Sequence, residues 1–133
     1  MRLRDIFQIT EVSAHCDLPC GVYDPAQARI EAESVKMIIQ KANESDDPDF
    51  RARAIVIKEE RSELVKHHLW VLWTDYFKPP HLEKYPQLHV LVNEATKLAG
   101  AQGTKGTFDE GKADELLAKI AEIDKIFWET KQG

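Results

Sequence analysis

Three residues near the N-terminus have side chains that bind transition metals: His15, Cys16 and Cys20. They lie in the stretch HCDLPCGVYDP, and the two cysteines are the only ones in the chain. Two cysteines are too few for a disulfide scaffold, and no second cysteine pair completes a structural zinc site. Their C-x₃-C spacing also differs from the C-x-x-C of thioredoxin-like motifs. Buried packing cysteines, a thiol redox pair and a metal site are therefore the alternatives.

Metal binding becomes the favoured alternative if the chain is cut after Ala14, where Val12-Ser13-Ala14 has the small residues of a cleavage site. His15 would then supply a free α-amine as well as its imidazole. The amine, the Cys16 amide nitrogen and the Cys16 sulfur would close two fused five-membered chelate rings, and Cys20 would add a second thiolate. Planar ligation by nitrogen and sulfur selects Ni(II) or Cu(II). Thiolate and amide donors stabilise the higher oxidation state of such a metal.

The composition limits the partners and the location of the chain. With 133 residues, the chain is expected to form a single domain. Its net charge of −5 argues against non-specific nucleic-acid binding. No stretch approaches the roughly 18 consecutive apolar residues of a membrane helix. Residues 1–14 contain no apolar run of a secretory signal, so we expect a cytoplasmic protein.

Capping residues and prolines divide the rest of the chain into four predicted helices. Asp24-Pro25 and Asp47-Pro48 each place a capping carboxylate before a proline that suits the first helical turn. The first helix is expected to end near residue 43, and the second near residue 77, where Lys78-Pro79-Pro80 stops it. A third helix is expected to start at Pro86. A fourth is expected to be capped by Asp109, after a flexible glycine-containing loop.

Each predicted helix has apolar residues along one face, and no segment of useful length alternates with period two. The residues expected on the core faces are, helix by helix, Ile30, Ser34, Val35, Ile38, Ile39 and Ala42; Phe50, Ala54, Ile57, Arg61, Leu64, His68 and Leu72; Leu88, Leu91, Val92, Ala95 and Leu98; Ala113, Leu116, Leu117, Ile120, Ile123 and Phe127. The pattern predicts an all-α protein, an up-down-up-down four-helix bundle with an irregular N-terminal metal-binding arm.

The stretch HCDLPCGVYDP resembles the metal-binding hook of the nickel superoxide dismutase family. The resemblance continues through ARIEAESVK, IKEERSEL, LWTDYFKPPHLEKYP and IDKIFWETK, so it covers nearly the whole chain. It implies a leader at 1–14 that a processing protease removes, and a single domain at 15–133. Within that domain, 15–23 would be the nickel hook and 24–131 the four-helix bundle. It also implies a homohexamer.

The resemblance implies that each subunit binds one nickel ion and converts superoxide to dioxygen and hydrogen peroxide, 2 O₂⁻ + 2 H⁺ → O₂ + H₂O₂. His15 would bind nickel through its α-amine and, in the oxidised form, its imidazole. Cys16 would bind through its amide nitrogen and thiolate, and Cys20 through its thiolate. Nickel would cycle between Ni(II) and Ni(III).

The resemblance also implies roles for residues around the metal. Glu31 and Arg61 match the pair that steers the His15 ring. Tyr23 matches the tyrosine beside the open face of the metal, Asp17 and Leu18 line the approach to it, and Tyr76 supports the same pocket.

Other interpretations of these residues remain open at this point. Glu31 and Arg61 lie in charge-rich helices, where such residues are commonly solvated, and Tyr23 could pack across the start of the first helix. Of the adjacent His67 and His68, we expect one to face the core and one to be exposed. For the whole chain, the alternatives are a non-catalytic nickel- or copper-binding helical protein and a thiol redox module.

Overall fold

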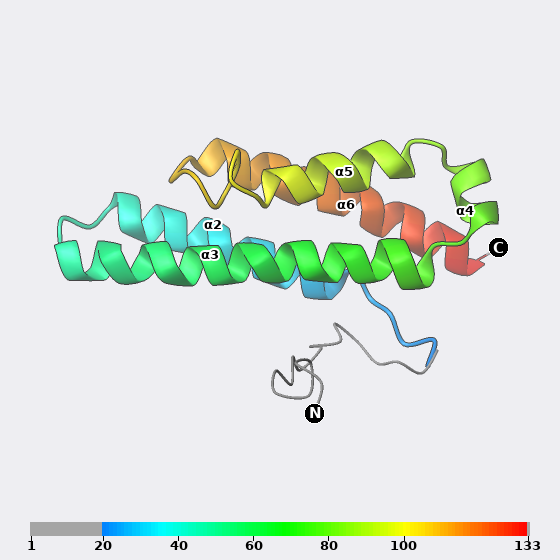
Figure 1. Cartoon of the computed structure of the whole chain (residues 1–133), viewed down its shortest axis with the longest axis horizontal. Helices are drawn as coiled ribbons and strands as arrows, with labels where there is room; N and C mark the ends of the chain where they lie inside the picture. The colour runs from blue at the N-terminus through cyan, green and yellow to red at the C-terminus, as the bar shows by residue number, and fades with distance from the viewer. Residues whose placement is uncertain (1–19, 133) are drawn as a thin grey trace, which may run out of the picture.

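The computed structural model of the chain describes residues 20–132, and this part contains helices and no strand. The elements are α2 (Ala26–Asn43), α3 (Pro48–Val71), the π-helical η1 (Leu72–Tyr76), α4 (Pro79–Lys84), α5 (Leu88–Leu98) and α6 (Glu110–Gln132). Helix α2 packs on α3 and α6, and α5 packs on α6 and α3. The four long helices therefore form an antiparallel bundle, with α4 at one end (Figure 1), and the predicted fold class is confirmed.

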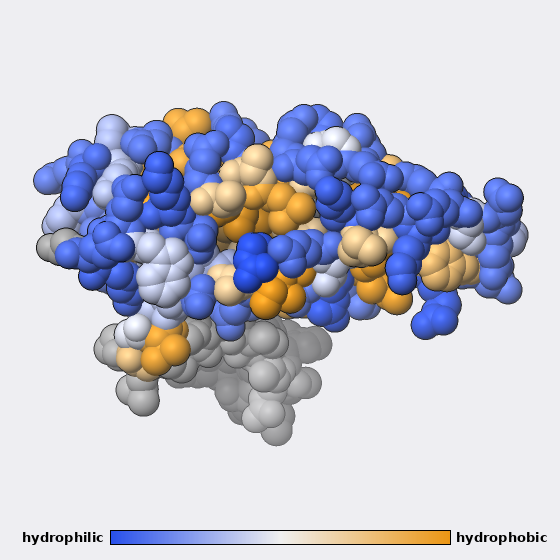
Figure 2. Space-filling view, turned by 180° about the vertical axis from the view of Figure 1, so that it is seen from behind, coloured by the Kyte–Doolittle hydropathy of each residue, from blue (hydrophilic) through white to orange (hydrophobic). Residues whose placement is uncertain are grey.

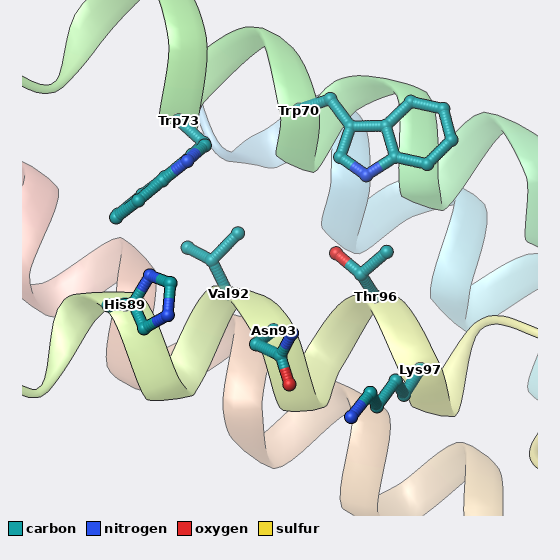
Figure 3. A pocket seen from close by; sticks show the side chains of 7 residues that line it. All are labelled: Trp70, Trp73, His89, Val92, Asn93, Thr96 and Lys97. Atoms are coloured by element: carbon teal, nitrogen blue, oxygen red, sulfur yellow. The ribbon is translucent and has the colours of Figure 1, made fainter.

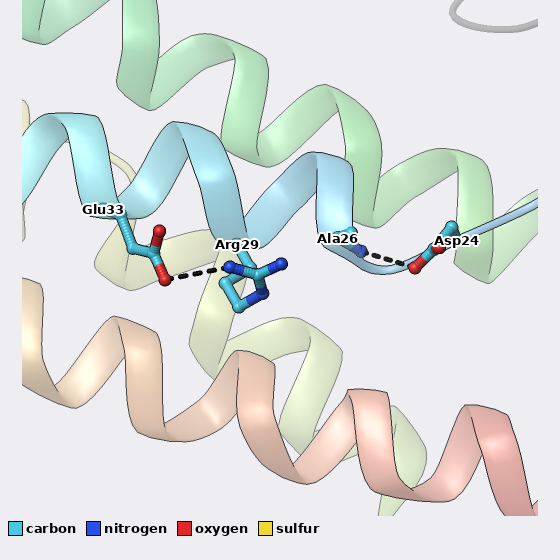
Figure 4. Close-up of polar contacts among 4 residues, drawn as sticks. All are labelled: Asp24, Ala26, Arg29 and Glu33. Carbon is cyan, nitrogen blue, oxygen red and sulfur yellow. Dashed lines mark hydrogen bonds and ion pairs between the residues drawn. The ribbon is translucent and has the colours of Figure 1, made fainter.

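The predicted caps position the two helices that follow the arm. The Ala26 amide donates a hydrogen bond to Asp24 Oδ1 at 2.9 Å at the start of α2 (Figure 4), and the Asp49 amide donates to Asp47 Oδ1 at 3.0 Å at the start of α3. Each bond satisfies an amide that has no partner within its helix. The arm consequently enters α2 at a fixed point.

The end of the second predicted helix differs from expectation in two ways. The last turn widens into η1, where the Phe77 amide donates to the Leu72 carbonyl at 2.9 Å. Pro79 ends that helix as predicted, but it also begins the short α4, which the sequence analysis did not predict. A single π-helical turn often marks a functional site. Here it sets the position of Tyr76.

The core consists mainly of aliphatic side chains and is divided into two clusters, the smaller of which contains Val35, Ile39 and Ala113. Its buried residues on α2, α5 and α6 are Ala28, Ala32, Val35, Ile39, Ala42, Leu88, Leu91, Val92, Ala95, Ala113, Leu116, Ile120, Ile123, Ile126 and Phe127. The predicted faces of the third and fourth helices are largely confirmed. On α2, Ile30 was assigned wrongly to the core, because it is 53% exposed and the small Ala28 and Ala32 face the bundle instead.

The predicted core face of α3 was only partly right: Ala54 and Leu72 are buried as expected, but other positions are not. Phe50 and Ile57 are 40% and 36% exposed, whereas the buried residues include Lys58 and Ser62. Periodicity assigns lysine and serine to the solvent side, so the expected stripe was rotated around the helix. Both polar groups are paired inside the protein, and the Ser62 hydroxyl forms a 2.7 Å hydrogen bond with the Thr104 hydroxyl.

Lys58 is fully buried under the loop that connects α5 to α6. Its ammonium donates hydrogen bonds to the carbonyls of Thr104, Lys105 and Thr107 at 2.6, 2.7 and 2.9 Å. It also lies 4.7 Å from the centre of the Phe108 ring, a cation–π contact. Burial lowers the pKa of Lys58 below the ordinary value for lysine. The three protons of the ammonium therefore match three carbonyls of the loop.

The connecting loop is tightly packed where the sequence analysis expected a flexible segment. A Cβ atom at Gly103 would lie 1.9 Å from the Leu98 carbonyl oxygen, and one at Gly106 would lie 1.9 Å from the Ala101 carbonyl oxygen. These glycines allow the close approach of two stretches of backbone. With Lys58, they close the end of the bundle that the short α5 does not cover.

Lys58→Met should therefore destabilise the protein while leaving a side chain of similar length. The three carbonyls would lose their donor inside the core, which costs about 2–4 kcal/mol. Chemical denaturation at neutral pH measures this loss, with the exposed Lys125→Met as the matched control, expected within about 0.5 kcal/mol of wild type. Equal midpoints for the two variants would contradict the structural role of Lys58.

Candidate metal centre

Cys20 is the one predicted metal ligand among residues 20–132; His15 and Cys16 lie outside the described residues. So do Asp17, Leu18 and the predicted leader. The Cys20 side chain is exposed, and its sulfur accepts a hydrogen bond from the Val22 amide at 3.4 Å. An N–H donor favours the thiolate, which is the metal-binding form of cysteine. The donor chemistry of Cys20 therefore fits a soft transition metal.

The backbone turns directly after Cys20. Gly21 has a φ of 73°, in the left-handed region that glycine adopts without a steric penalty. Tyr23 follows two residues later and is half-buried. The turn lets Cys20 remain at the surface while Tyr23 packs against the bundle.

Tyr23 packs against a group of rings that we call the aromatic base: Tyr76, Phe77, His81 and Phe127. The Tyr23 and Tyr76 ring centres are 5.6 Å apart, and those of Tyr76 and Phe127 are 4.4 Å apart. The His81 ring is stacked on Tyr76 at 5.6 Å, with 13° between the planes. The aromatic base joins the ends of α3 and α6, so two long helices position the residue that follows the arm.

Glu31 and Arg61 are in contact, as the resemblance implied. Arg61 Nη1 lies 3.2 Å and 3.1 Å from the two carboxylate oxygens of Glu31. The Glu31 side chain is 16% exposed and that of Arg61 is 39% exposed. A pair this exposed contributes at most about 1 kcal/mol to stability. The interpretation of the two residues as separate solvated charges is therefore wrong. Arg61 holds the half-buried Glu31 carboxylate in one place.

His68 lies in the electrostatic field of the same pair. Burial lowers the pKa of His68 below the ordinary value, the neighbouring His67 lowers it further, and Glu31 raises it. Burial, the largest of these influences, favours the uncharged imidazole of His68. The expectation that one of the two histidines would be exposed is wrong, because both are half-buried. Across residues 20–132, no group of three His, Cys, Asp or Glu side chains is placed to hold a metal.

A hollow of about 360 Å³, which we call the Trp70 hollow, lies between the end of α3 and α5 (Figure 3). Trp70 and Trp73 line one side, and residues of α5, among them His89, line the other; the Trp73 and His89 rings are 5.5 Å apart. Trp70 is 40% exposed. The hollow has no sulfur or carboxylate, so its chemistry suits packing against another surface better than metal binding.

One residue beside the aromatic base was missed in the sequence analysis. The Thr130 hydroxyl lies 2.7 Å from the Tyr76 hydroxyl, although 54 positions separate the two residues in the chain. A threonine near the end of a helix has no distinctive sequence signal, since only the packing of α6 on the end of α3 brings the two side chains together.

Known proteins are similar to this chain over most of its length. Residues 10–131 match the family model of nickel-containing superoxide dismutase. The superoxide dismutase [Ni] of Streptomyces coelicolor is 64% identical over 122 residues, which are 92% of each chain. That of Streptomyces seoulensis is 65% identical over 123 residues, again 92% of each chain.

Solved structures agree with these sequence matches. A native structure of nickel superoxide dismutase has a TM-score of 0.86 and 63% identity, and covers 90% of this chain and 100% of its own. A structure described as having nickel ligation of the oxidised state has the same TM-score and coverage, with 64% identity. With the family model matched over residues 10–131, this chain belongs to the nickel-containing superoxide dismutase family.

Proposed function

We propose that this chain is the precursor of a nickel-dependent superoxide dismutase, which converts superoxide to dioxygen and hydrogen peroxide. The observation that carries the proposal is the 64% identity with a superoxide dismutase [Ni] over 92% of both chains. The non-catalytic alternative, a nickel- or copper-binding helical protein, is not favoured by these relatives, and neither is a thiol redox module.

The proposed nickel ligands are His15, Cys16 and Cys20, with one ion per subunit. Bound nickel would supply a one-electron redox couple, Ni(II)/Ni(III), that can accept an electron from one superoxide and give it to the next. The described part of the hook supports this assignment through the exposed Cys20 sulfur and its amide donor. Tyr23 and Asp17 are proposed to line the approach of superoxide, and the aromatic base holds the Tyr23 ring.

Glu31 and Arg61 are proposed to orient the His15 ring. A metal-binding histidine commonly donates its second ring N–H to a carboxylate, which fixes the ring and raises its basicity. Glu31 is suited to accept such a bond, because Arg61 holds its carboxylate in place and only 16% of its side chain is exposed.

A protease is proposed to cut before His15 and free the α-amine. Removing 14 residues leaves 119 of the 133. The solved chains are covered completely by 90% of this chain, about the share that remains after such a cut. The leader carries two basic and two acidic residues, so the cut leaves the net charge unchanged.

Assembly into a homohexamer is proposed from the exposed apolar residues. Phe50 and Ile57 on α3 line a hollow of about 200 Å³ that Ile38 on α2 completes. The Trp70 hollow lies elsewhere on the bundle, and aromatic residues are enriched in interfaces. Figure 2 shows further hydrophobic side chains in the middle of the rear face, surrounded by hydrophilic ones.

A cytoplasmic location is proposed from the sequence. Among residues 20–132, no helix is long and apolar enough to cross a membrane. The net charge of −5 gives no support to a nucleic-acid partner.

Cys16→Ser and Cys20→Ser should each abolish nickel-dependent activity and leave the bundle folded. A hydroxyl oxygen is a poor substitute for a thiolate toward nickel, and Cys20 lies outside the core. Superoxide consumption and denaturation midpoints measure the two effects. The arm variant Val22→Ala, which keeps the amide donor to Cys20, is the control. Near-full activity in either serine variant would refute the ligand assignment.

Glu31→Ala and Arg61→Ala should lower activity about 10–100-fold while nickel remains bound, because partners of metal ligands have effects of that size. Activity and nickel content are measured on the same samples. Glu33→Ala is the matched control, since it breaks the exposed 3.0 Å Arg29–Glu33 ion pair on the same helix (Figure 4). If Glu31→Ala behaves like Glu33→Ala, the Glu31–Arg61 pair has no role in the reaction.

The uncleaved chain should be inactive with nickel supplied, because the His15 nitrogen is then bonded to Ala14 and is no longer the free α-amine that the proposed ligand set requires. Three forms separate this effect from folding: the full chain, the chain that begins at His15, and the chain that begins at Ala14. All should have the same helical content, and only the form that begins at His15 should consume superoxide. Comparable activity in the form that begins at Ala14 would exclude the α-amine as a ligand.

A further inference from the structure

The hydroxyl of Thr130 forms two hydrogen bonds at the C-terminal end of α6. Its oxygen lies 2.5 Å from the Phe127 carbonyl oxygen, one turn earlier in the helix. It also lies 2.7 Å from the hydroxyl oxygen of Tyr76, the last residue of η1. This pair of contacts links the aromatic base to the backbone of α6.

The direction of both hydrogen bonds follows from counting protons. A carbonyl oxygen can only accept, so the bond to Phe127 uses the single hydroxyl proton of Thr130. The Thr130 oxygen then has only lone pairs to offer to Tyr76. Tyr76 must therefore be the donor, and its one hydroxyl proton is committed to α6.

The Tyr76 ring has little freedom to redirect that proton. The centres of the Phe127 and Tyr23 rings lie 4.4 and 5.6 Å from the centre of the Tyr76 ring, and the His81 ring is stacked on it. The Lys131 ammonium lies 5.0 Å from the ring centre, a cation–π contact. The ring is therefore held from several sides by α4, α6 and Tyr23.

We propose that Thr130 is a positioning residue of the nickel site: it orients the Tyr76 hydroxyl so that the tyrosine accepts hydrogen bonds at the site and does not donate its proton there. The proposal rests on the proposed function, in which Tyr23 lines the approach of superoxide and Tyr76, in contact with Tyr23, supports the same pocket. Its consequence is chemical. The two protons that hydrogen peroxide gains come from a source other than the Tyr76 hydroxyl.

The proton direction can be tested without nickel, on the 133-residue chain, by locating the hydroxyl protons with nuclear magnetic resonance. We expect a slowly exchanging Tyr76 hydroxyl proton with a nuclear Overhauser contact to the Thr130 methyl group. It should exchange faster in Thr130→Val, which keeps the shape but accepts no hydrogen bond, and remain protected in Thr130→Ser. A Thr130 hydroxyl proton directed at Tyr76 would overturn the proposal.

The role in the reaction is tested in the nickel-loaded form that begins at His15. Thr130→Val should lower kcat/KM about fivefold, the size expected for one neutral hydrogen bond, and Thr130→Ser should restore it. With Tyr76→Phe already present, Thr130→Val should have no further effect, because Thr130 acts through the hydroxyl. Independent, additive losses would overturn the positioning role.

Thr74→Val provides the matched control. Thr74 also donates to a carbonyl of its own helix, Trp70 at 2.8 Å, but contacts no tyrosine hydroxyl in the described part of the chain. The Thr74→Val variant should have the same kcat/KM as the wild type. A loss in Thr74→Val equal to that in Thr130→Val would overturn the specific role of Thr130. If the wild-type form lacks nickel-dependent activity, the proposed function fails, whereas the resonance experiment still decides the proton direction.

Discussion

The contact between Tyr76 and Phe127, with ring centres 4.4 Å apart, is the interaction on which the position of the arm depends. It ties the π-helical end of α3 to α6, and Tyr23 packs on the surface that results. Tyr23 lies three residues from Cys20, so its packing restricts where the proposed ligand Cys20 lies relative to the bundle. The described residues next to the proposed nickel ligands are thus held by rigid helices, which favours a precise site.

At the opposite end of the bundle, the loop between α5 and α6 covers part of the core. Helix α5 has 11 residues and α3 has 24, so α5 leaves part of the core uncovered. The loop from α5 to α6 fills the gap, and Lys58 supplies the hydrogen bonds that its buried carbonyls need. The core at this end depends on a buried charge and close glycine contacts, whereas the end near the arm depends on aromatic packing.

Local signals in the sequence were sufficient for the four long helices and insufficient for η1, for α4 and for the contacts between helices. Asp24 and Asp47 mark helix starts because capping is a short-range interaction. The core face of α3 could not be found by periodicity, since Lys58 and Ser62 are buried with partners distant in the chain. The Glu31–Arg61 contact was predicted through resemblance alone. The Tyr76–Thr130 bond has no sequence signal and required the structure.

The most direct test of the central claim is X-ray absorption at the nickel edge of the form that begins at His15, compared with its Cys20→Ser variant. The central claim is that the N-terminus and both cysteines bind one nickel ion on a bundle that is already formed. The account predicts one nickel per chain with two sulfur neighbours and nitrogen donors, and loss of one sulfur in the variant. Nickel bound without sulfur, or a spectrum unchanged by Cys20→Ser, would contradict it.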